Sequence, residues 1–414
     1  MEQTVFYIII AIVFFDFFVE RVFDLLNAGK VDAHVPERFK GFMDEKKYQK
    51  AQDYKKVKDR FGLVVASLSF IVLLLMLWYE GFAVIDEFWR NYTDNDILLA
   101  LLFFGSLGIA ADILSTPFSW YSTFVVEEKF GFNKTNLKTF FLDKVKGWVL
   151  GIIIGGGLLA LIVWIYKITG EYFWLIAWGV ITFFTVFMNM FYSTLIVPLF
   201  NKQTPLEDGP LRNEIERFAE KAGFKLDNIF VIDGSKRSAK SNAYFAGLGP
   251  KKRIVLFDTL IENHTKEELV AVLAHEIGHY KKKHTLSNMV ISFLQTGILL
   301  YILSFVINSP VMSGALGAEQ SSFHLGILAF GLLFTPVNFV LGVFMNMLSR
   351  KFEYQADEFA GKYYSAKSLK NALKKLSADN LSNLYPHPAY VFVYYSHPPV
   401  LKRLKFLDQF EKNS

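Results

Sequence analysis

The residues best suited to chemistry form a pentapeptide that begins at His275, continues with Glu276 and ends at His279. On a helix, positions i and i+4 lie on one face, so the two imidazoles can bind the same metal ion. Zinc is the metal that this motif typically holds, and the glutamate between the histidines is then placed to act as a general base on water. The motif therefore predicts a hydrolase with one zinc ion per chain, with His275 and His279 as ligands and Glu276 as the catalytic base.

A catalytic zinc ion usually has three protein ligands, so a third must come from elsewhere in the chain. The chain has no cysteine, which leaves histidine and carboxylate side chains as donors and excludes a thiol nucleophile. Glu353 is the best candidate, because it follows the last strongly apolar stretch and is expected on a helical continuation of it. Asp357 lies one turn further on the same face, where a carboxylate can hydrogen-bond a ligand histidine.

The sequence around the histidine motif favours a small α+β unit. An amphipathic pattern predicts a helix at 208–222. Thr265 and Glu268 form a capping box, which is the pattern that begins a helix, and apolar residues then recur at helical spacing through the motif. Short apolar runs between turns rich in Gly and Lys predict three strands, at 229–232, 243–245 and 254–257.

Composition places this unit in a membrane protein. Hydrophobic residues make up 52% of the 414-residue chain and the mean hydropathy is +0.29, which is too apolar for an ordinary soluble enzyme. The net charge is only +5, and the basic residues gather in particular loops instead of along one face. That distribution favours membrane topology, makes the lipid bilayer a partner and excludes nucleic acid as one.

Seven stretches have the length of about twenty apolar residues that a helix needs to cross a bilayer. The first carries Asp16, Glu20 and Arg21, so we interpret it as a retained helix and not as a cleavable leader. The fold class is therefore an α-helical multi-span membrane protein with seven transmembrane helices. The predicted spans lie near 5–25, 61–82, 97–123, 147–166, 172–197, 286–307 and 323–347.

Loop charges orient these spans. The loop between the first two spans, the loop around 129–146 and the segment after the last span are rich in Lys and Arg, whereas 83–96 and 308–322 are poor in them. The positive-inside rule then predicts an N-terminus outside the cell and an active site on the cytoplasmic side. Four parts follow: transmembrane helices one to five at 1–199, a cytosolic α+β protease segment at 200–284, helices six and seven at 285–349, and a cytosolic segment that completes the site at 350–414.

The ordered motifs resemble those of the type I CAAX prenyl endoprotease family, which consists of integral membrane zinc proteases. The histidine motif alone fits many zinc proteases, but seven stretches in the same order, over nearly the whole chain, are far more specific. They are VVEEKFGFNKT from Val125, VPLFNKQTPLEDG from Val197, SKRSAKSNAYFAG from Ser235, KRIVLFDTLI from Lys252, HEIGHYKKKHT from His275, FEYQADEFA from Phe352 and YSHPPVLKRL from Tyr395. The resemblance implies a ring of seven helices around an enclosed chamber, with zinc chemistry at its cytoplasmic end.

The resemblance also implies roles for residues outside the histidine motif. Asn242 and Ala243 are expected to bind substrate, beside a strand whose edge holds an extended peptide by main-chain pairing. His397 is expected to contact the substrate and stabilise the oxyanion, and Arg403 to pair with a carboxylate of the site. The other five histidines have no comparable context, and we interpret them as surface or interfacial residues: His34, His264, His284, His324 and His387.

Two features depart from the eukaryotic pattern of that family. Lys240 stands where eukaryotic relatives tend to have histidine, and the tail from Glu411 to Ser414 has no dibasic retrieval signal. A bacterial inner membrane is therefore the favoured location, with the endoplasmic reticulum as the alternative for a eukaryotic source.

Three functions remain open at this point. The first is an endopeptidase of CAAX type that cuts a peptide or protein substrate, prenylated at a C-terminal CAAX sequence or not. The second is a bacterial quality-control metalloprotease, which cuts membrane proteins by the same chemistry without needing a prenyl group. A seven-helix carrier or receptor has a similar hydropathy profile, but it has no need for the zinc motif or for a distal glutamate ligand.

Overall fold

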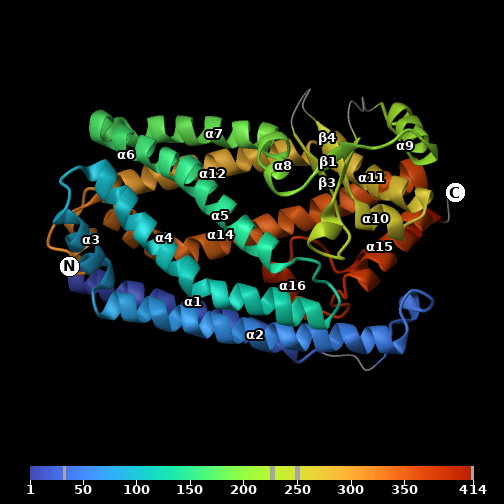
Figure 1. Ribbon diagram of the computed structural model, residues 1–414, viewed down its shortest axis with the longest axis horizontal. Helices are drawn as coiled ribbons and strands as arrows, with labels where there is room; N and C mark the ends of the chain where they lie inside the picture. The colour runs from blue at the N-terminus through green and yellow to red at the C-terminus, as the bar shows by residue number, and fades with distance from the viewer. Residues whose placement is uncertain (31–33, 224–228, 248–251, 412–414) are drawn as a thin grey trace.

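The computed structural model describes residues 1–30, 34–223, 229–247 and 252–411, so the tail at 412–414 lies outside the described residues. The chain is mostly helical, and its longest helices run along the long axis of the molecule (Figure 1). The N-terminus lies at one end of these helices, and a small sheet with its own helices lies at the other end.

In the part of the chain that the structure describes, five helical stretches are long and apolar enough to cross a bilayer: Glu45–Trp78, Asp96–Glu127, Leu137–Phe200, His284–Val306 and Phe323–Asp379. The third stretch turns back at Gly170, where φ is +53°, so that its two long halves pack against each other. Each of the seven predicted spans overlaps a helix. The long helices are α1 (Glu2–Ala28), α2 (Glu45–Trp78), α4 (Asp96–Tyr121), α5 (Leu137–Leu150), α6 (Gly157–Thr169), α7 (Phe173–Leu195), α12 (His284–Val306) and α14 (Phe323–Ala360).

The outer surfaces of these helices are apolar. Phe15, Ile152, Phe183 and Phe305 are each more than 60% exposed. Soluble proteins seldom leave contiguous apolar surface of this kind in water, whereas lipid tails cover it at no cost. The packing thus agrees with the hydropathy: the helices bury one side against each other and present the other side to the bilayer.

The end of the bundle away from the sheet is closed by α3 (Gly81–Arg90) and α13 (Pro310–Gly314). His324, near the start of α14, is buried there, with its Nε2 2.5 Å from Asp86 Oδ1. The Nε of Arg90 donates to the other oxygen of Asp86 at 2.7 Å. The interpretation of His324 as a surface or interfacial residue is therefore wrong, because a buried carboxylate satisfies its ring.

The opposite end carries a four-stranded sheet in the order β1-β2-β4-β3. Strands β2 (Ile229–Ile232) and β4 (Arg253–Phe257) are parallel, and β3 (Ala243–Ala246) pairs antiparallel with β4 at the edge. The three predicted strands are confirmed to within one residue. Strand β1 (Gln203–Pro205) was not predicted, because three residues that begin with Gln203 carry no alternation to reveal a strand.

The helix with the histidine motif, α11 (Lys266–Lys281), packs between the sheet and the end of α14. It begins with the predicted capping box at Thr265, and its Leu273 and Ile277 are fully buried, which stabilises the packing by about 1.5–3 kcal/mol per side chain. A Cβ at Gly278 would lie 3.1 Å from the Cα of Ala356 on α14. Only glycine lets the two helices approach so closely, so Gly278→Val should force them apart.

The remaining elements connect these parts and complete the site. The predicted helix at 208–222 is confirmed as α9 (Pro210–Lys221). The others are α8 (Val197–Phe200), α10 (Asp258–Asn263), α15 (Ala366–Asp379), α16 (Pro388–Tyr394), α17 (Val400–Glu411), and the short helices η1 (Glu37–Phe39), η2 (Ser122–Glu127), η3 (Gly151–Gly156), η4 (Gly170–Tyr172), η5 (Gly234–Lys236) and η7 (Gly361–Ser365).

Candidate metal centre

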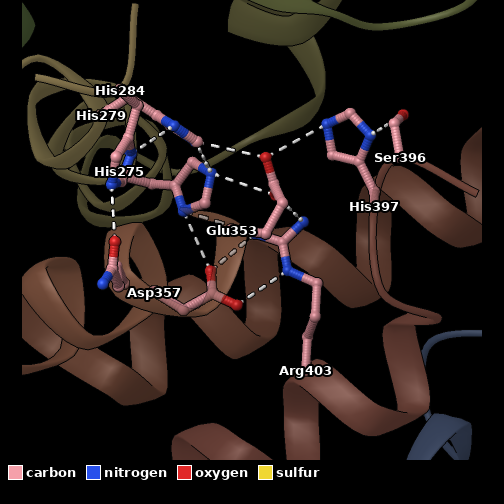
Figure 2. Close-up of polar contacts among 9 residues, drawn as sticks. His275, His279, His284, Glu353, Asp357, Ser396, His397 and Arg403 are labelled. Atoms are coloured by element: carbon pink, nitrogen blue, oxygen red, sulfur yellow. Dashed lines mark hydrogen bonds and ion pairs between the residues drawn. The ribbon is translucent and has the colours of Figure 1, made fainter. Parts of the chain in front are cut away.

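Three predicted ligands converge where α11 meets the end of α14 (Figure 2). The Nε2 atoms of His275 and His279 lie 3.1 Å apart, because the two residues are one helical turn apart on α11. The carboxylate of Glu353 faces both, 3.5 Å from Nε2 of His275 and 3.2 Å from Nε2 of His279. The three donor atoms lie within 4.8 Å of one another, which suits a single ion.

The polar atoms of this cluster fit a cation. Glu353 is 4% exposed, and its Oε2 makes no hydrogen bond among the described residues, although the Nη1 of Arg403 lies 3.2 Å away. A buried carboxylate is costly unless cations or donors surround it, and a bound metal ion supplies a further cation. Two nitrogens and one carboxylate oxygen are the donor set that catalytic zinc uses, with a fourth position left for water or substrate.

His275 is held from behind by a buried ion pair. Its Nδ1 lies 2.9 Å from Oδ1 of Asp357, which is 0% exposed. Arg403, on α17, grips the same carboxylate with both Nε, at 2.8 Å, and Nη2, at 2.6 Å. Its Nη1 lies 3.2 Å from Glu353 Oε2, so one guanidinium balances two buried carboxylates. Arg403 thus contacts both of the carboxylates near the histidine motif.

These contacts change the protonation of the site. Burial alone lowers the pKa of His275, but its hydrogen bonds to Asp357 and Glu353 outweigh burial and raise the pKa to about 9 in the metal-free chain. Burial likewise lowers the pKa of Arg403, and the adjacent carboxylates of Asp357 and Glu353 raise it above its usual value, so the guanidinium stays charged.

The second candidate ligand has a partner that the sequence analysis missed. His284 is 3% exposed, and its Nδ1 lies 3.1 Å from Nδ1 of His279. The interpretation of His284 as a surface or interfacial residue is wrong, and so is that of His264, which is buried against the carbonyl of Leu260. The sequence does place His284 directly after the helix of the motif, which could have indicated that it lies near the site. Its ring reaches His279 only because the turn at Lys283 reverses the chain.

The candidate ligands open onto a cavity of about 440 Å³. Its walls include Glu276 on α11, Asn242 and Ala243 at the start of β3, and His397 on the loop before α17. The Nε2 of His397 lies 3.3 Å from Glu353 Oε1, and its side chain is 64% exposed. All predicted site residues therefore either line this cavity or, like Asp357, support a residue that does.

The segment that leads into β3 is fixed from two sides. Lys240 donates to Glu127 at 2.8 Å and to the hydroxyl of Tyr54 at 2.7 Å, which ties it to α2 and η2. The side chain of Asn380 accepts from the amide of Ser241 and donates to its carbonyl, both at 3.2 Å. The first residues of β3 are thereby held at a defined distance from the three candidate metal ligands.

Comparisons with known proteins agree with this geometry. Residues 25–202 match the family described as the CAAX prenyl protease N-terminal part with five membrane helices, and residues 205–411 match peptidase family M48. A CAAX prenyl protease 1 homolog of Arabidopsis thaliana is 36% identical over 100% of this chain and 99% of its own length. The human homolog is 34% identical over 93% of this chain and 90% of its own length.

A solved structure extends the likeness to the fold. The crystal structure of S. mikatae Ste24p matches with a TM-score of 0.91 and 33% identity, over 98% of this chain and 99% of that one. Fold and site together define an integral membrane metalloendopeptidase. The chain belongs to the CAAX prenyl protease family within peptidase family M48, as its motifs indicated.

Proposed function

We propose that this metalloendopeptidase uses one zinc ion, held by His275, His279 and Glu353, to cut extended peptides that include prenylated CAAX substrates. The observation that carries the proposal is the cavity, which has the three candidate ligands on one wall and the edge strand β3 on another. The Arabidopsis and human relatives are both named CAAX prenyl protease 1 homolog, and these names support the choice of substrate class.

Substrate binding follows from the sheet. Within the described residues, β3 is an edge strand of the sheet, and three of its residues, Ala243, Tyr244 and Phe245, line the cavity. An extended peptide adds to such an edge as a further strand. The Oδ1 of Asn242 accepts from the amide of Ala243 at 2.9 Å, and among the described residues its NH₂ group has no acceptor, so it can donate to a substrate carbonyl.

The chemistry is divided among the residues of the cavity. A bound zinc ion polarises the scissile carbonyl and makes water more acidic. Glu276 takes the proton of the attacking water and passes it to the leaving amine. His397 donates a hydrogen bond to the oxyanion as charge develops on it. Asp357 accepts from Nδ1–H of His275, which leaves the Nε2 lone pair facing Glu353 and His279.

The membrane arrangement follows from hydropathy and loop charge. Helices α1, α2, α4, α6, α7, α12 and α14 all cross the bilayer, surround a chamber, and place the α+β unit with its zinc site on the cytoplasmic side. Because the chain has no cysteine, single cysteines can report sidedness. A cysteine at Ser309 should react with an impermeant thiol reagent only from outside, and one at Glu220 only from the cytosol; the reverse pattern would overturn this orientation.

The role of the prenyl group can be tested with one peptide in two forms. The cavity residues named here hold the peptide backbone and the reacting carbonyl, and none of them requires a lipid on the substrate. A farnesyl group should add affinity by burying methylene groups, at about 0.8 kcal/mol each, away from the scissile bond. We expect both forms to be cut, with a lower KM and a similar kcat for the farnesylated peptide. A bare peptide that stays intact at saturating concentration would make lipid recognition part of catalysis.

A further inference from the structure

His284 is buried beside the candidate metal ligands, but it has no part in the proposed chemistry. The ring of His284 lies flat on Phe352, with centroids 4.1 Å apart and planes at 10°. Its Nδ1 faces Nδ1 of His279 at 3.1 Å, and its Nε2 faces Oε1 of Gln355 at 2.8 Å. Both ring nitrogens thus have a partner, and Figure 2 draws the ring on the side of His279 away from Glu353.

The direction of the hydrogen bonds that run from His279 through His284 to Gln355 is determined. If Nε2 of His279 is the metal donor, its Nδ1 carries the proton and must donate. The acceptor is Nδ1 of His284, whose own proton must then lie on Nε2 and be donated to the amide oxygen of Gln355. An amide oxygen can only accept a hydrogen bond, so each group in the series donates toward Gln355.

The local backbone is built to make this contact. Helix α11 ends at Lys281 and α12 begins at His284, with Lys283 between them in the left-handed conformation at φ +58°. A lysine rarely adopts this conformation, which costs about 1 kcal/mol or more and marks a position that its surroundings constrain. The turn folds His284 back against the helix that it has just left.

We propose that His284 and Gln355 form a neutral relay that fixes the tautomer and the ring orientation of His279 and thereby sets the affinity of the site for zinc. His284 is a positioning residue and not a fourth ligand, because its nearest ring nitrogen faces Nδ1 of His279, the side opposite to the metal. Helix α14 supplies the end of this relay from Gln355, midway between Glu353 and Asp357. The inference rests on the assignment of His279 as a ligand in the proposed function.

The test separates hydrogen bonding from packing with two variants at one position. His284→Phe keeps an aromatic ring on Phe352 but cannot accept a hydrogen bond, whereas the amide oxygen of His284→Asn can replace Nδ1. Zinc affinity is measured by competition with a chelator on the purified full chain, so the readout does not depend on activity. The dissociation constant should rise about 10–100-fold in the Phe variant, and the Asn variant should recover most of that loss.

The outcomes distinguish this inference from the proposed function. A Phe variant that binds zinc like the wild type, or an Asn variant as weak as the Phe variant, would overturn the relay. If the Phe variant does not fold, Gln355→Leu decides: a weaker zinc affinity supports the relay, and an unchanged one contradicts it. His264→Phe, which removes a buried imidazole that contacts the backbone carbonyl of Leu260, is the matched control and should bind zinc normally. A wild type without stoichiometric zinc would instead refute the proposed function.

Discussion

Near each end of helix α14, a buried histidine contacts a carboxylate that also binds an arginine. At the far end His324 contacts Asp86, which Arg90 holds; at the other end His275 contacts Asp357, which Arg403 holds. The residue types and distances are nearly the same. Within the described residues, however, only the second cluster belongs to a group of side chains that can hold a metal ion.

The difference lies in which ring nitrogen the carboxylate occupies. Asp86 takes Nε2 of His324, whose ring also packs on Phe103 at 4.5 Å, so this histidine joins α3, α4 and α14. Asp357 takes Nδ1 of His275 and leaves Nε2 for a second histidine and Glu353. In this protein the cluster at His324 therefore joins helices, whereas the cluster at His275 belongs to a candidate site because the other ring nitrogen of this histidine faces further donors.

The largest effect is expected from a substitution of Glu276, and it tests whether catalysis takes place at the end of α14 that lies against α11. Glu276→Gln removes the base without removing a ligand, so kcat/KM should fall about 10²–10⁴-fold while zinc stays bound in stoichiometric amount. Peptide cleavage and metal content measured on the same preparation check this. Loss of zinc from this variant would mean that Glu276 has been given the wrong role.

The next effect compares the two carboxylates directly. Asp357→Asn should weaken zinc binding about 10–100-fold, because the amide no longer holds the Nδ1 proton of His275 as a carboxylate does. Asp86→Asn should lower the melting temperature in detergent without changing zinc affinity, since it removes the buried charge that pairs with the half-buried Arg90 and with His324. Equal loss of zinc affinity in the two variants would contradict the inference that only the cluster with Asp357 supports metal binding.

The pH dependence of zinc binding should follow from the raised pKa of His275. In the metal-free chain this imidazole keeps its proton until about pH 9, whereas zinc needs the neutral form, so binding releases that proton. Apparent zinc affinity should therefore rise about tenfold per pH unit from about pH 7 and level off near pH 9. Chelator competition across this range measures the slope, and Asp357→Asn, which removes the main cause of the raised pKa, should flatten it.

A smaller effect is expected from Lys240, through which α2 and η2 hold the segment that leads into β3. Lys240→Met removes the contacts with Glu127 and Tyr54 but leaves the metal cluster intact. Because charged hydrogen bonds of this kind are worth about 1.5–3 kcal/mol and Asn380 still holds Ser241, we expect KM to rise about tenfold with little change in kcat or zinc affinity. Lys240→Arg should restore part of the loss. A fall in kcat alone would place Lys240 in the chemistry instead.

The sequence was sufficient for the parts of the site that depend on local pattern. The capping box at Thr265 and the spacing of His275 and His279 define a helix and a metal-binding face without any tertiary information. Glu353 followed from the continuation of an apolar helix, and α14 does run unbroken from Phe323 to Ala360. The strands before the motif were found because each is a short apolar run between turns.

Tertiary contacts decide what the sequence could not. The relay through His284 depends on the conformation of Lys283 and on a glutamine about seventy positions away, which no local pattern reveals. The burial of His324 depends on Asp86, from another helix. Lone histidines are usually exposed or partly exposed, so a surface position was the reasonable expectation until the helices were assembled.

The position of β3 at the edge of the sheet has a further consequence, which concerns aggregation in the cell. An open strand edge normally invites other chains to add to it, and proteins protect such edges with charges, bulges or coverings. Here β3 lines the cavity beside the candidate ligands, so a neighbouring chain must enter that cavity before it can add to the strand. An extended segment should enter more readily than a folded strand that is already paired in its own sheet. The position of β3 would then limit aggregation and also favour substrates that are locally unfolded around the scissile bond.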